Sequence, residues 1–357
     1  MFLVAVFFTF CPFGFLWDIV DLGTHPPARL ALEVAIAGAI AVAYVAATMN
    51  PRVFVPIVVA AHILATSQLY RFVPFYTASL PAADLRARLG VDAAATIGSM
   101  VIAYVVLTTF IVRQGTRLVR ARTEIALARD IHRLLVPPIA QRIGGFEFRG
   151  VSLPSGEVGG DLVDLVHDGD RWIGYVADVS GHGVASGLLM GMVKSAARMK
   201  LREGVSIGAL MDDLNVVLLD LKKPEMYVTF ACVQSDGSRE LQFSLAGHLP
   251  ILHYQAARSA IAELSVPQIP LAMFEGRRFV SAPVSCAPGD LLVIVTDGFT
   301  EVFDARDREF GFDRLKALVI EHANAPLETL TGAVLTAVRA HGAQTDDQTL
   351  LVVRASA

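Results

Sequence analysis

The sequence predicts an α+β soluble domain preceded by an all-α transmembrane bundle, and two observations lead to this fold class. Hydrophobic residues make up 54% of the chain and charged residues only 18%, and the apolar excess lies almost entirely before residue 113. From about residue 143 onward, short β-rich runs alternate with turns and with helical patterns. We therefore expect a transmembrane domain at 1–113, a connecting helix at 114–138 and a soluble domain at 139–357.

The transmembrane domain is expected to contain about four helices, because each of its apolar stretches approaches the roughly 20 residues needed to cross a bilayer. These stretches are 1–17, 31–49, 53–70 and 93–112. The first has no positive flank and no small-residue cleavage site, which favours a retained span over a signal peptide. The basic run "RQGTRLVRAR" after the last span favours a cytoplasmic exit. Usage rich in alanine and arginine is typical of a GC-rich bacterium, so we expect a multi-pass protein of the bacterial inner membrane, in contact with lipid, whose soluble domain is cytoplasmic.

Two ionisable residues, Glu33 and His62, fall within these stretches. An ionisable group at membrane depth is by default a candidate for sensing or ligand contact. The alternative interpretation is structural: Glu33 reaches water near a helix end, and His62 is neutral and hydrogen-bonded within the bundle. The residues alone leave both interpretations open.

The connecting segment 114–136 has a helix-forming composition and stops at Pro137-Pro138. One stripe of its residues fits the a/d positions of a heptad repeat: Leu118, Ala121, Ile125, Ala128, His132 and Leu135. A neighbouring apolar stripe contains Leu127, Ile131 and Leu134. Such a seam is typical of a short parallel coiled coil, which would make the protein a homodimer, but also of a helix that packs on its own domain.

The soluble domain contains β-rich runs that mostly follow one another without an intervening helix, which favours antiparallel sheets. The runs are "FEFRGVS", "WIGYVADV", "YVTFACV", "LQFSLA", "PILHY", "DLLVIVT" and "QTLLVVR". Helical patterns lie at 184–201, 206–222, 313–323 and 327–341. Sheets and helices in separate layers define an α+β domain.

Four aspartates share a similar local pattern of an apolar stretch beside glycine or another small residue: Asp161, Asp178, Asp297 and Asp346. Asp161 lies between a double glycine and an apolar pair, and the other three lie at the ends of β-rich runs. A carboxylate is unfavourable in apolar surroundings unless it is paired, and no lysine or arginine is near any of the four in sequence. Strand-end carboxylates without basic partners indicate a hard divalent cation, which prefers oxygen ligands. The alternative for any one position is ordinary turn chemistry, since Asp and Gly are good turn formers.

Several other functions are excluded by bulk properties. A net charge of −4 and a pI near 6.1 supply no basic footprint for nucleic acid. Cys11, Cys232 and Cys286 are far apart and lack metal-binding spacing, so we expect buried, reduced thiols. The apolar stretches show no paired broken-helix repeats, which argues against a transporter.

The soluble part resembles the SpoIIE-like branch of the metal-dependent PPM serine/threonine phosphatases over about 125–354. The resemblance rests on motifs that occur in the family's order: "EVGGDLVD", "ADVSGHGVASGLLMGMVKSAAR", "LAGHLPILHY", "VIVTDGFTEVFDARDREFGFDRL" and "TDDQTLLVV". It implies a PPM-type sandwich of two antiparallel β-sheets flanked by helices, with two divalent cations, Mn²⁺ or Mg²⁺, at one edge.

The resemblance also implies roles for individual residues. Asp161, Asp178, Asp297 and Asp346 correspond to metal ligands, with Asp178 bridging the two ions and the carbonyl of Val179 adding a contact. His182 is either a general acid toward the leaving seryl oxygen or a brace for its glycine loop. Outside the ligand set, His248 braces the site, Asp164 and Asp347 either help through bound waters or simply cap turns, and Glu157 is an outer residue.

Two departures from the family pattern are Leu162-Val163, in place of an aromatic pair, and Ala272 after Pro270-Leu271, in place of glycine. Neither touches an expected ligand, although substrate docking is expected to differ. The implied function is a membrane-anchored phosphatase that hydrolyses phosphoserine or phosphothreonine on a phosphorylated regulatory protein, of the anti-sigma-antagonist type, in response to a signal. The alternative is an inactive membrane receptor whose phosphatase-like domain only binds a partner.

Overall fold

The computed structural model describes residues 2–20, 27–47, 56, 59–60, 63, 82–181 and 183–356. Contacts divide the chain into two compact units, Met1–Arg122 and Thr123–Ala357. The predicted span over 53–70, with His62, lies almost entirely outside the described residues, and His182 also lies outside them.

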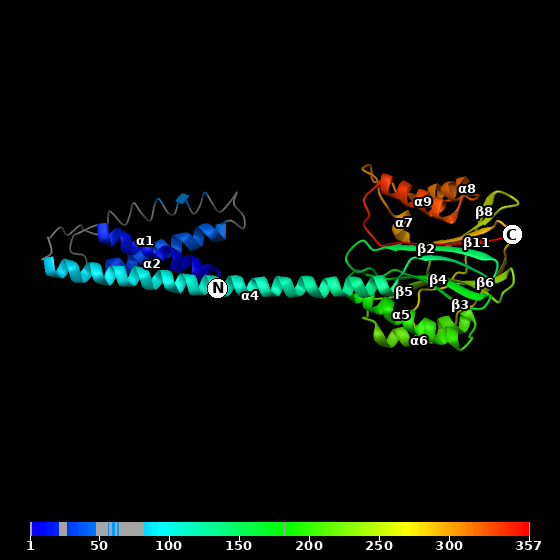
Figure 1. Ribbon diagram of the computed structural model, residues 1–357, viewed down its shortest axis with the longest axis horizontal. Coiled ribbons are helices and arrows are strands. Elements are labelled where there is room, and N and C mark those ends of the chain that lie inside the picture. Colours follow the sequence, from blue (N-terminus) through cyan, green and yellow to red (C-terminus); the bar gives the residue numbers. More distant parts are fainter. Residues whose placement is uncertain are drawn as a thin grey trace. The chain divides into compact units, whose positions relative to one another are not determined.

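The first unit is helical in its described residues, with α1 (Phe2–Val20), α2 (Pro27–Ala47) and the first part of α4 (Ala82–Leu135) (Figure 1). Helices α1 and α2 pack closely, because a Cβ added at Gly38 would meet Phe7 Cδ2 at 2.6 Å. Glu33 is buried within this unit, with only 6% of its surface exposed. A small residue at position 38 therefore allows the two helices to approach.

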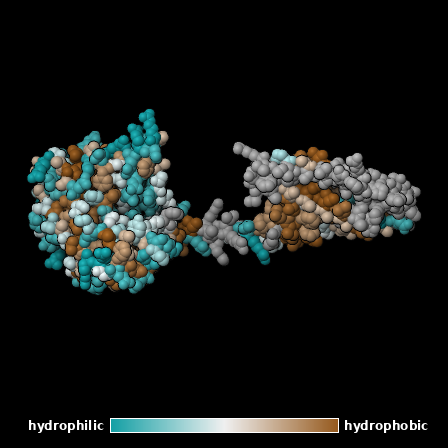
Figure 2. Space-filling model, turned by 180° about the vertical axis from the view of Figure 1, so that it is seen from behind, coloured by the Kyte–Doolittle hydropathy of each residue, from teal (hydrophilic) through white to brown (hydrophobic). Residues whose placement is uncertain are grey.

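One described helix is long and apolar enough to cross a membrane. It is the Asp84–Gln114 part of α4, 31 residues with a mean hydropathy of 2.1. Its apolar side chains face outward, with Ile97 63% and Tyr104 69% exposed, and Figure 2 shows apolar surface over the described helices of this unit. Two further apolar helices, Phe2–Phe13 and Ala31–Val45, are shorter.

The second unit contains two antiparallel sheets. Sheet A has the strand order β1-β2-β11-β10-β7-β8, with bounds Ile139–Ile143, Phe146–Leu153, Gln348–Ala355, Leu291–Val295, Ile251–Gln255 and Ala260–Leu264. Sheet B has the order β3-β4-β5-β6-β9, with bounds Leu162–Asp168, Arg171–Val179, Val228–Ser235, Glu240–Ala246 and Ala282–Ser285. The two sheets, with helices in outer layers, form the α+β architecture that the sequence predicts (Figure 1).

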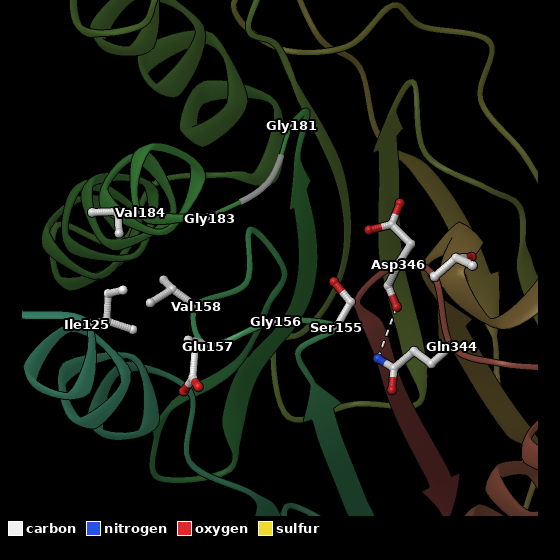
Figure 3. A pocket seen from close by; sticks show the side chains of 11 residues that line it. Ile125, Ser155, Gly156, Glu157, Val158, Gly181, Gly183, Val184, Gln344 and Asp346 are labelled. Atoms are coloured by element: carbon white, nitrogen blue, oxygen red, sulfur yellow. Dashed lines mark hydrogen bonds between the residues drawn. The ribbon is translucent and has the colours of Figure 1, made fainter. Parts of the chain in front are cut away.

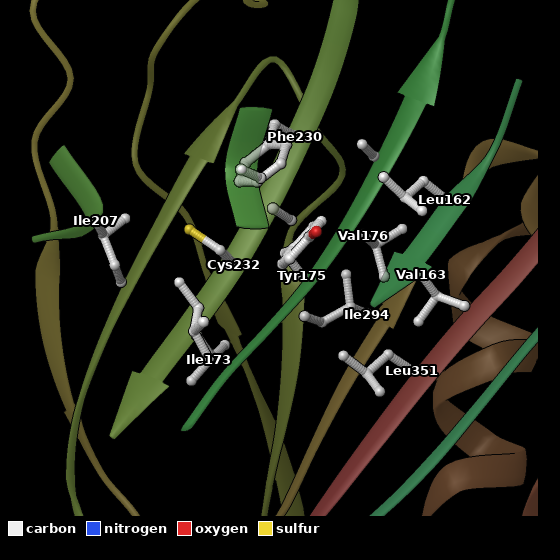
Figure 4. Close-up of a cluster of buried hydrophobic side chains, with 14 of the residues drawn as sticks. Leu162, Val163, Ile173, Tyr175, Val176, Ile207, Phe230, Cys232, Ile294 and Leu351 are labelled. Carbon is white, nitrogen blue, oxygen red and sulfur yellow. The ribbon is translucent and has the colours of Figure 1, made fainter. Parts of the chain in front are cut away.

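The alternation of side chains along β10 shows how the layers are held together. Leu292 and Ile294 belong to the larger core, which lies between the two sheets and continues to the helices that cover sheet B. Leu291, Val293 and Val295 belong to the second core, which lies between sheet A and its covering helices. Successive side chains of a strand point to opposite faces, so a strand buried on both faces is apolar throughout. Figure 4 shows Ile294 among residues of sheet B in the first core.

Helices cover the outer face of each sheet (Figure 1). α5 (Val184–Arg202) and α6 (Ile207–Leu221) bury Met190, Val193 and Leu214 in the core with sheet B. α8 (Gly311–Glu321) and α9 (Leu327–His341) bury apolar side chains in the core with sheet A, as does the short α7 (Asp297–Thr300). All three cysteines are buried and free, as expected.

The connecting segment is part of the continuous helix α4, and its orientation differs from the predicted seam. His132, assigned to an a/d position, is only 5% exposed in the core of its own unit, whereas Leu134 is 81% exposed. Leu127 and Ile131 are exposed with Leu134. The a/d stripe near the end of α4 therefore packs on its own domain. The neighbouring stripe of Leu127, Ile131 and Leu134 is exposed on the surface.

Candidate active site

The topology brings the four strand-end aspartates to one end of the sandwich. Asp161 directly precedes β3 and Asp178 is next to last in β4, and these antiparallel strands are paired at Leu162 and Ala177. Asp297 follows β10 and Asp346 precedes β11, and those strands are paired at Val295 and Leu350. Each sheet therefore contributes two carboxylates at the same edge.

The four carboxylates lie close enough to affect one another. The pKa of Asp178 is raised to about 7 by burial and by the charges of Asp297 and Asp346. Burial, followed by the charge of Asp178, raises the pKa of Asp161 well above its ordinary range. Burial and the charge of Asp346 raise the pKa of Asp297. Among the ion pairs of the described residues, none supplies a lysine or arginine to any of the four. Their mutual repulsion is therefore uncompensated by protein cations.

This donor set suits a hard divalent cation, which binds carboxylate and carbonyl oxygens. Within the described ranges, no three acidic, histidine or cysteine side chains form a preformed metal site. The aspartates are thus close enough for their charges to interact, but they do not form a closed ligand shell. The carboxylates that would hold a cation are present, and bringing a cation among them would relieve their mutual repulsion.

Asp161 is positioned by a residue of the opposite sheet's edge. Thr296 Oγ1 donates a 2.8 Å hydrogen bond to Asp161 Oδ2 and accepts a 3.0 Å hydrogen bond from Thr349 N. Asp161 itself is 2% exposed. Thr296 was not singled out from the sequence; its only signal there is its place between a buried strand and Asp297. It ties the sheet B carboxylate to the end of β10.

Asp347 fixes the glycine loop that leads into Asp161. Its carboxylate accepts hydrogen bonds from Ser155 N at 2.6 Å, Ser155 Oγ at 2.9 Å and Gly160 N at 2.7 Å. A Cβ at Gly159 would lie 2.4 Å from Asp347 Oδ2, and one at Gly160 would lie 2.7 Å from Val179 O. The double glycine is needed because the loop passes against both groups.

Asp164 is bound elsewhere. Its Oδ2 accepts hydrogen bonds from Arg198 Nε at 2.6 Å and Tyr175 Oη at 2.8 Å, and its Oδ1 accepts from Arg198 at 2.7 Å and Lys194 Nζ at 3.1 Å. Burial alone would raise the pKa of Asp164, but these partners lower it. This carboxylate is fully engaged in a buried ionic cluster between β3 and α5, so we assign it a structural role.

The remaining candidates have individual surroundings. The imidazole of His248 places Nδ1 3.2 Å from the Leu249 carbonyl oxygen, and burial lowers its pKa to about 4, so the ring is neutral at physiological pH. Glu157 forms a 2.9 Å ion pair with Arg129 of α4. Asp297 was expected to end a strand, but β10 ends at Val295 and Asp297 begins α7.

Glu301 is an acid near the site that the sequence did not single out. Burial, and then the charge of Asp297, raise its pKa, with smaller contributions from Glu309 and Asp346. It lies four residues after Asp297, across one short turn of helix, which is the one signal that would have found it. The acidic edge therefore extends beyond the four aspartates.

A cleft of about 490 Å³ opens beside Asp346, and we call it the flanking cleft. It lies between α4, the loop before β3, the glycine loop before α5 and the loop before β11 (Figure 3). One of its walls is Ile125 of the connecting helix. The site thus has an acidic edge and an adjoining groove.

Comparison with known proteins decides the family. The family model of Stage II sporulation protein E (SpoIIE) matches residues 168–356, which is more than half of the chain. The chain belongs to the SpoIIE family. This confirms the resemblance and the enzyme class predicted from the motifs, a phosphoserine phosphatase of the PPM type. Phosphatases of this class use divalent metal ions.

Individual relatives are distant. Phosphoserine phosphatase RsbU of Bacillus subtilis is 23% identical over 238 residues, covering 65% of this chain and 70% of its own. The crystal structure of the RsbU and RsbW domains of a Mycobacterium tuberculosis protein is 24% identical, with a TM-score of 0.56, and covers 62% of this chain and 63% of that one. The SiaA-PP2C domain of Pseudomonas aeruginosa is 20% identical, with a TM-score of 0.57, and covers 67% and 98%. At these identities the two structures show a shared fold.

Proposed function

We propose that this SpoIIE-family phosphatase hydrolyses phosphoserine or phosphothreonine on a regulatory partner protein of the anti-sigma-antagonist type. The observation that carries the proposal is the gathering of Asp161, Asp178, Asp297 and Asp346 from two sheets without protein cations. The name of the RsbU relative, a phosphoserine phosphatase, supports the substrate class.

In this proposal, the four aspartates and the carbonyl of Val179 would hold two divalent cations, Mn²⁺ or Mg²⁺. Such ions, when bound, lower the pKa of a bound water and orient it toward phosphorus. The protein's own part is to hold these oxygens: Thr296 positions Asp161, and Asp347 holds the glycine loop. His182 either protonates the leaving seryl oxygen or braces its loop.

Metal removal tests the proposal directly. The full chain in detergent should hydrolyse p-nitrophenyl phosphate and a phosphoserine peptide when Mn²⁺ or Mg²⁺ is present, lose this activity in EDTA and regain it when metal is restored. Turnover that is independent of divalent metal would contradict the assignment. Specific binding of phosphoprotein without any turnover would instead favour the binding-only receptor.

We also propose that the first unit is a multi-pass membrane domain and that the protein is a homodimer. The Asp84–Gln114 helix and the shorter apolar helices support the membrane placement. The exposed apolar stripe of Leu127, Ile131 and Leu134 supports pairing of two copies of α4. This stripe replaces the a/d seam as the pairing face, because His132 is buried in its own unit.

Both parts of this proposal are tested on one preparation. The chain should stay in bacterial membranes after an alkaline carbonate wash, and the detergent-solubilised chain should scatter light with the mass of a dimer. Ile131→Asp should shift the mass toward a monomer, because a charge in an apolar seam is unfavourable. Release of the chain by carbonate would contradict the membrane placement. A monomeric wild-type chain would contradict the homodimer.

Signal coupling is proposed to pass from α4 to α5, which would move together and alter metal occupancy at Asp178. Lys194 of α5 donates a hydrogen bond to the carbonyl of Leu135 at the end of α4. The two helices approach where a Cβ at Gly191 would lie 3.2 Å from Leu135 Cδ1. The first turns of α5 also pack on the loop before Asp161, since a Cβ at Gly187 would meet Val158 Cγ1 at 2.3 Å. A displacement of α4 would therefore shift α5 and, through α5, the loop before Asp161. Turnover and metal affinity that stay unchanged when Lys194→Met removes this hydrogen bond would contradict the coupling.

A further inference from the structure

The flanking cleft has two ends of different chemistry (Figure 3). Toward Asp346, its lining is polar, with Ser155 and Gln344 close by. At the other end, Ile125, Val158 and Val184 come from three separate segments and lie near one another. An apolar end joined to a polar end is typical of a site that binds one side chain while fixing a polar group beside it.

The apolar end is open to a ligand. Ile125 is 42% exposed and Val184 is 49% exposed, while Val158 is buried. Exposed apolar side chains that converge in a groove gain free energy when a further apolar group covers them. The structure therefore leaves room for one apolar side chain at this end of the cleft.

The position of Ile125 is set by its own helix. Arg129 lies one turn later on the same face of α4, and it forms a 2.9 Å ion pair with Glu157 of the loop before β3. This pair turns the Ile125 face of α4 toward the cleft. At the polar end, Gln344 Nε2 donates hydrogen bonds to Leu153 O at 2.8 Å and Asp346 O at 3.0 Å, which fixes the opposite wall.

The apolar end of the cleft selects its occupant. Among the described residues of the lining, the ionisable side chains are Glu157 and Asp346, and Glu157 is already paired with Arg129. An apolar residue beside the phosphoserine would be covered by Ile125, Val158 and Val184, whereas a glycine or a charged residue would leave that apolar surface in water. The cleft adjoins the acidic edge through Asp346, so a peptide whose phosphate lies at that edge has its neighbouring residue at the cleft.

We propose that the flanking cleft binds an apolar side chain adjacent to the phosphoserine of the protein substrate, and that Ile125 of the connecting helix determines this specificity. The inference rests on the proposed function and deepens it. The connecting helix then forms part of the substrate-binding surface. A displacement of α4 would therefore change selection among phosphoproteins as well as the metal site.

The test uses the full chain in detergent with Mn²⁺ and three kinds of substrate: p-nitrophenyl phosphate, phosphoserine peptides flanked by leucine, and matched peptides flanked by glycine. Wild type should prefer the leucine peptides by about tenfold in kcat/KM, as expected for an apolar side chain in an apolar pocket. Ile125→Asn should abolish the preference by raising KM for the leucine peptides, with a smaller effect on p-nitrophenyl phosphate, which has no side chain to place in the cleft. Ile125→Leu should retain it.

Ile320→Asn is the matched control, because Ile320 of α8 is 41% exposed and lies outside the cleft. It should leave the leucine preference intact. Equal kcat/KM for both peptide sets in wild type would overturn the inference, as would a preference that survives Ile125→Asn. An equal loss on all three substrates in Ile125→Asn would also overturn it. Failure of wild type to hydrolyse any substrate would instead refute the proposed function itself.

Discussion

Asp178→Asn is expected to reduce metal-dependent phosphatase activity by about 10³-fold or more, and at the same time to raise the thermal stability of the metal-free protein. The loss of activity follows because Asp178 is one of the proposed metal ligands, and asparagine would withdraw a negative charge from the site that holds the cations. A 10³-fold loss corresponds to about 4 kcal/mol of transition-state stabilisation.

The gain in stability follows from the electrostatics of the metal-free site. Folding raises the pKa of Asp178 from its ordinary 3.8 to about 7, because burial and the neighbouring charges disfavour the carboxylate. The folded state then binds the proton more tightly than the unfolded chain, so ionised Asp178 destabilises the fold progressively from about pH 4 upward and fully above about pH 7. Asparagine removes this penalty, which amounts to about 4 kcal/mol at pH 8.

Activity assays with Mn²⁺ and thermal melts in EDTA measure the two effects on the same full-length preparation. Asp168→Asn, an exposed aspartate at the far end of the same hairpin, should change neither. A variant at position 178 that keeps a tenth or more of wild-type activity would remove Asp178 from the ligand set. A melting temperature of Asp178→Asn below that of wild type in EDTA would contradict the proposed repulsion among the carboxylates.

Asp164→Asn is expected to destabilise the second unit by about 3–5 kcal/mol, because it breaks a buried ionic cluster and leaves a buried cation without its partner. Lys194 is only 7% exposed and relies on Asp164 for its charged hydrogen-bond partner. An asparagine also turns an NH₂ group toward Arg198 or Lys194. For a unit of this size the melting temperature should fall by about 10 °C.

The pH dependence of this contribution has a definite sign. The pKa of Asp164 is lowered in the fold, since the hydrogen bond from Arg198 and the charge of Lys194 outweigh burial. The stabilisation is therefore complete above the unfolded pKa and is lost as pH falls through the lower folded pKa. Wild type and Asp164→Asn should differ most near neutrality and converge in strong acid. Melts across pH, with Asp168→Asn as control, check this; a difference that is constant with pH would contradict the ionic origin.

Much of the second unit was predictable because its strands bury one or both faces. Every strand run and every helical pattern expected after residue 143 forms within a few residues of its predicted bounds. β3 was not expected as a strand, since the acids Asp164 and Asp168 interrupt its apolar pattern. β1, β8 and β9 were missed because they are short edge strands that are largely exposed, with little alternation for a sequence to display.

The sequence by itself determined the fold class, the phosphatase family and the aspartates at the strand ends, because periodicity and local motifs are short-range properties. Only the tertiary structure decided which charges meet. Asp164 differs from Asp161 because Lys194 and Arg198 reach it from α5, a contact between distant segments that no local pattern specifies. The same holds for Ile125, whose place in the flanking cleft follows from how α4 packs on its own domain rather than from its position in a heptad.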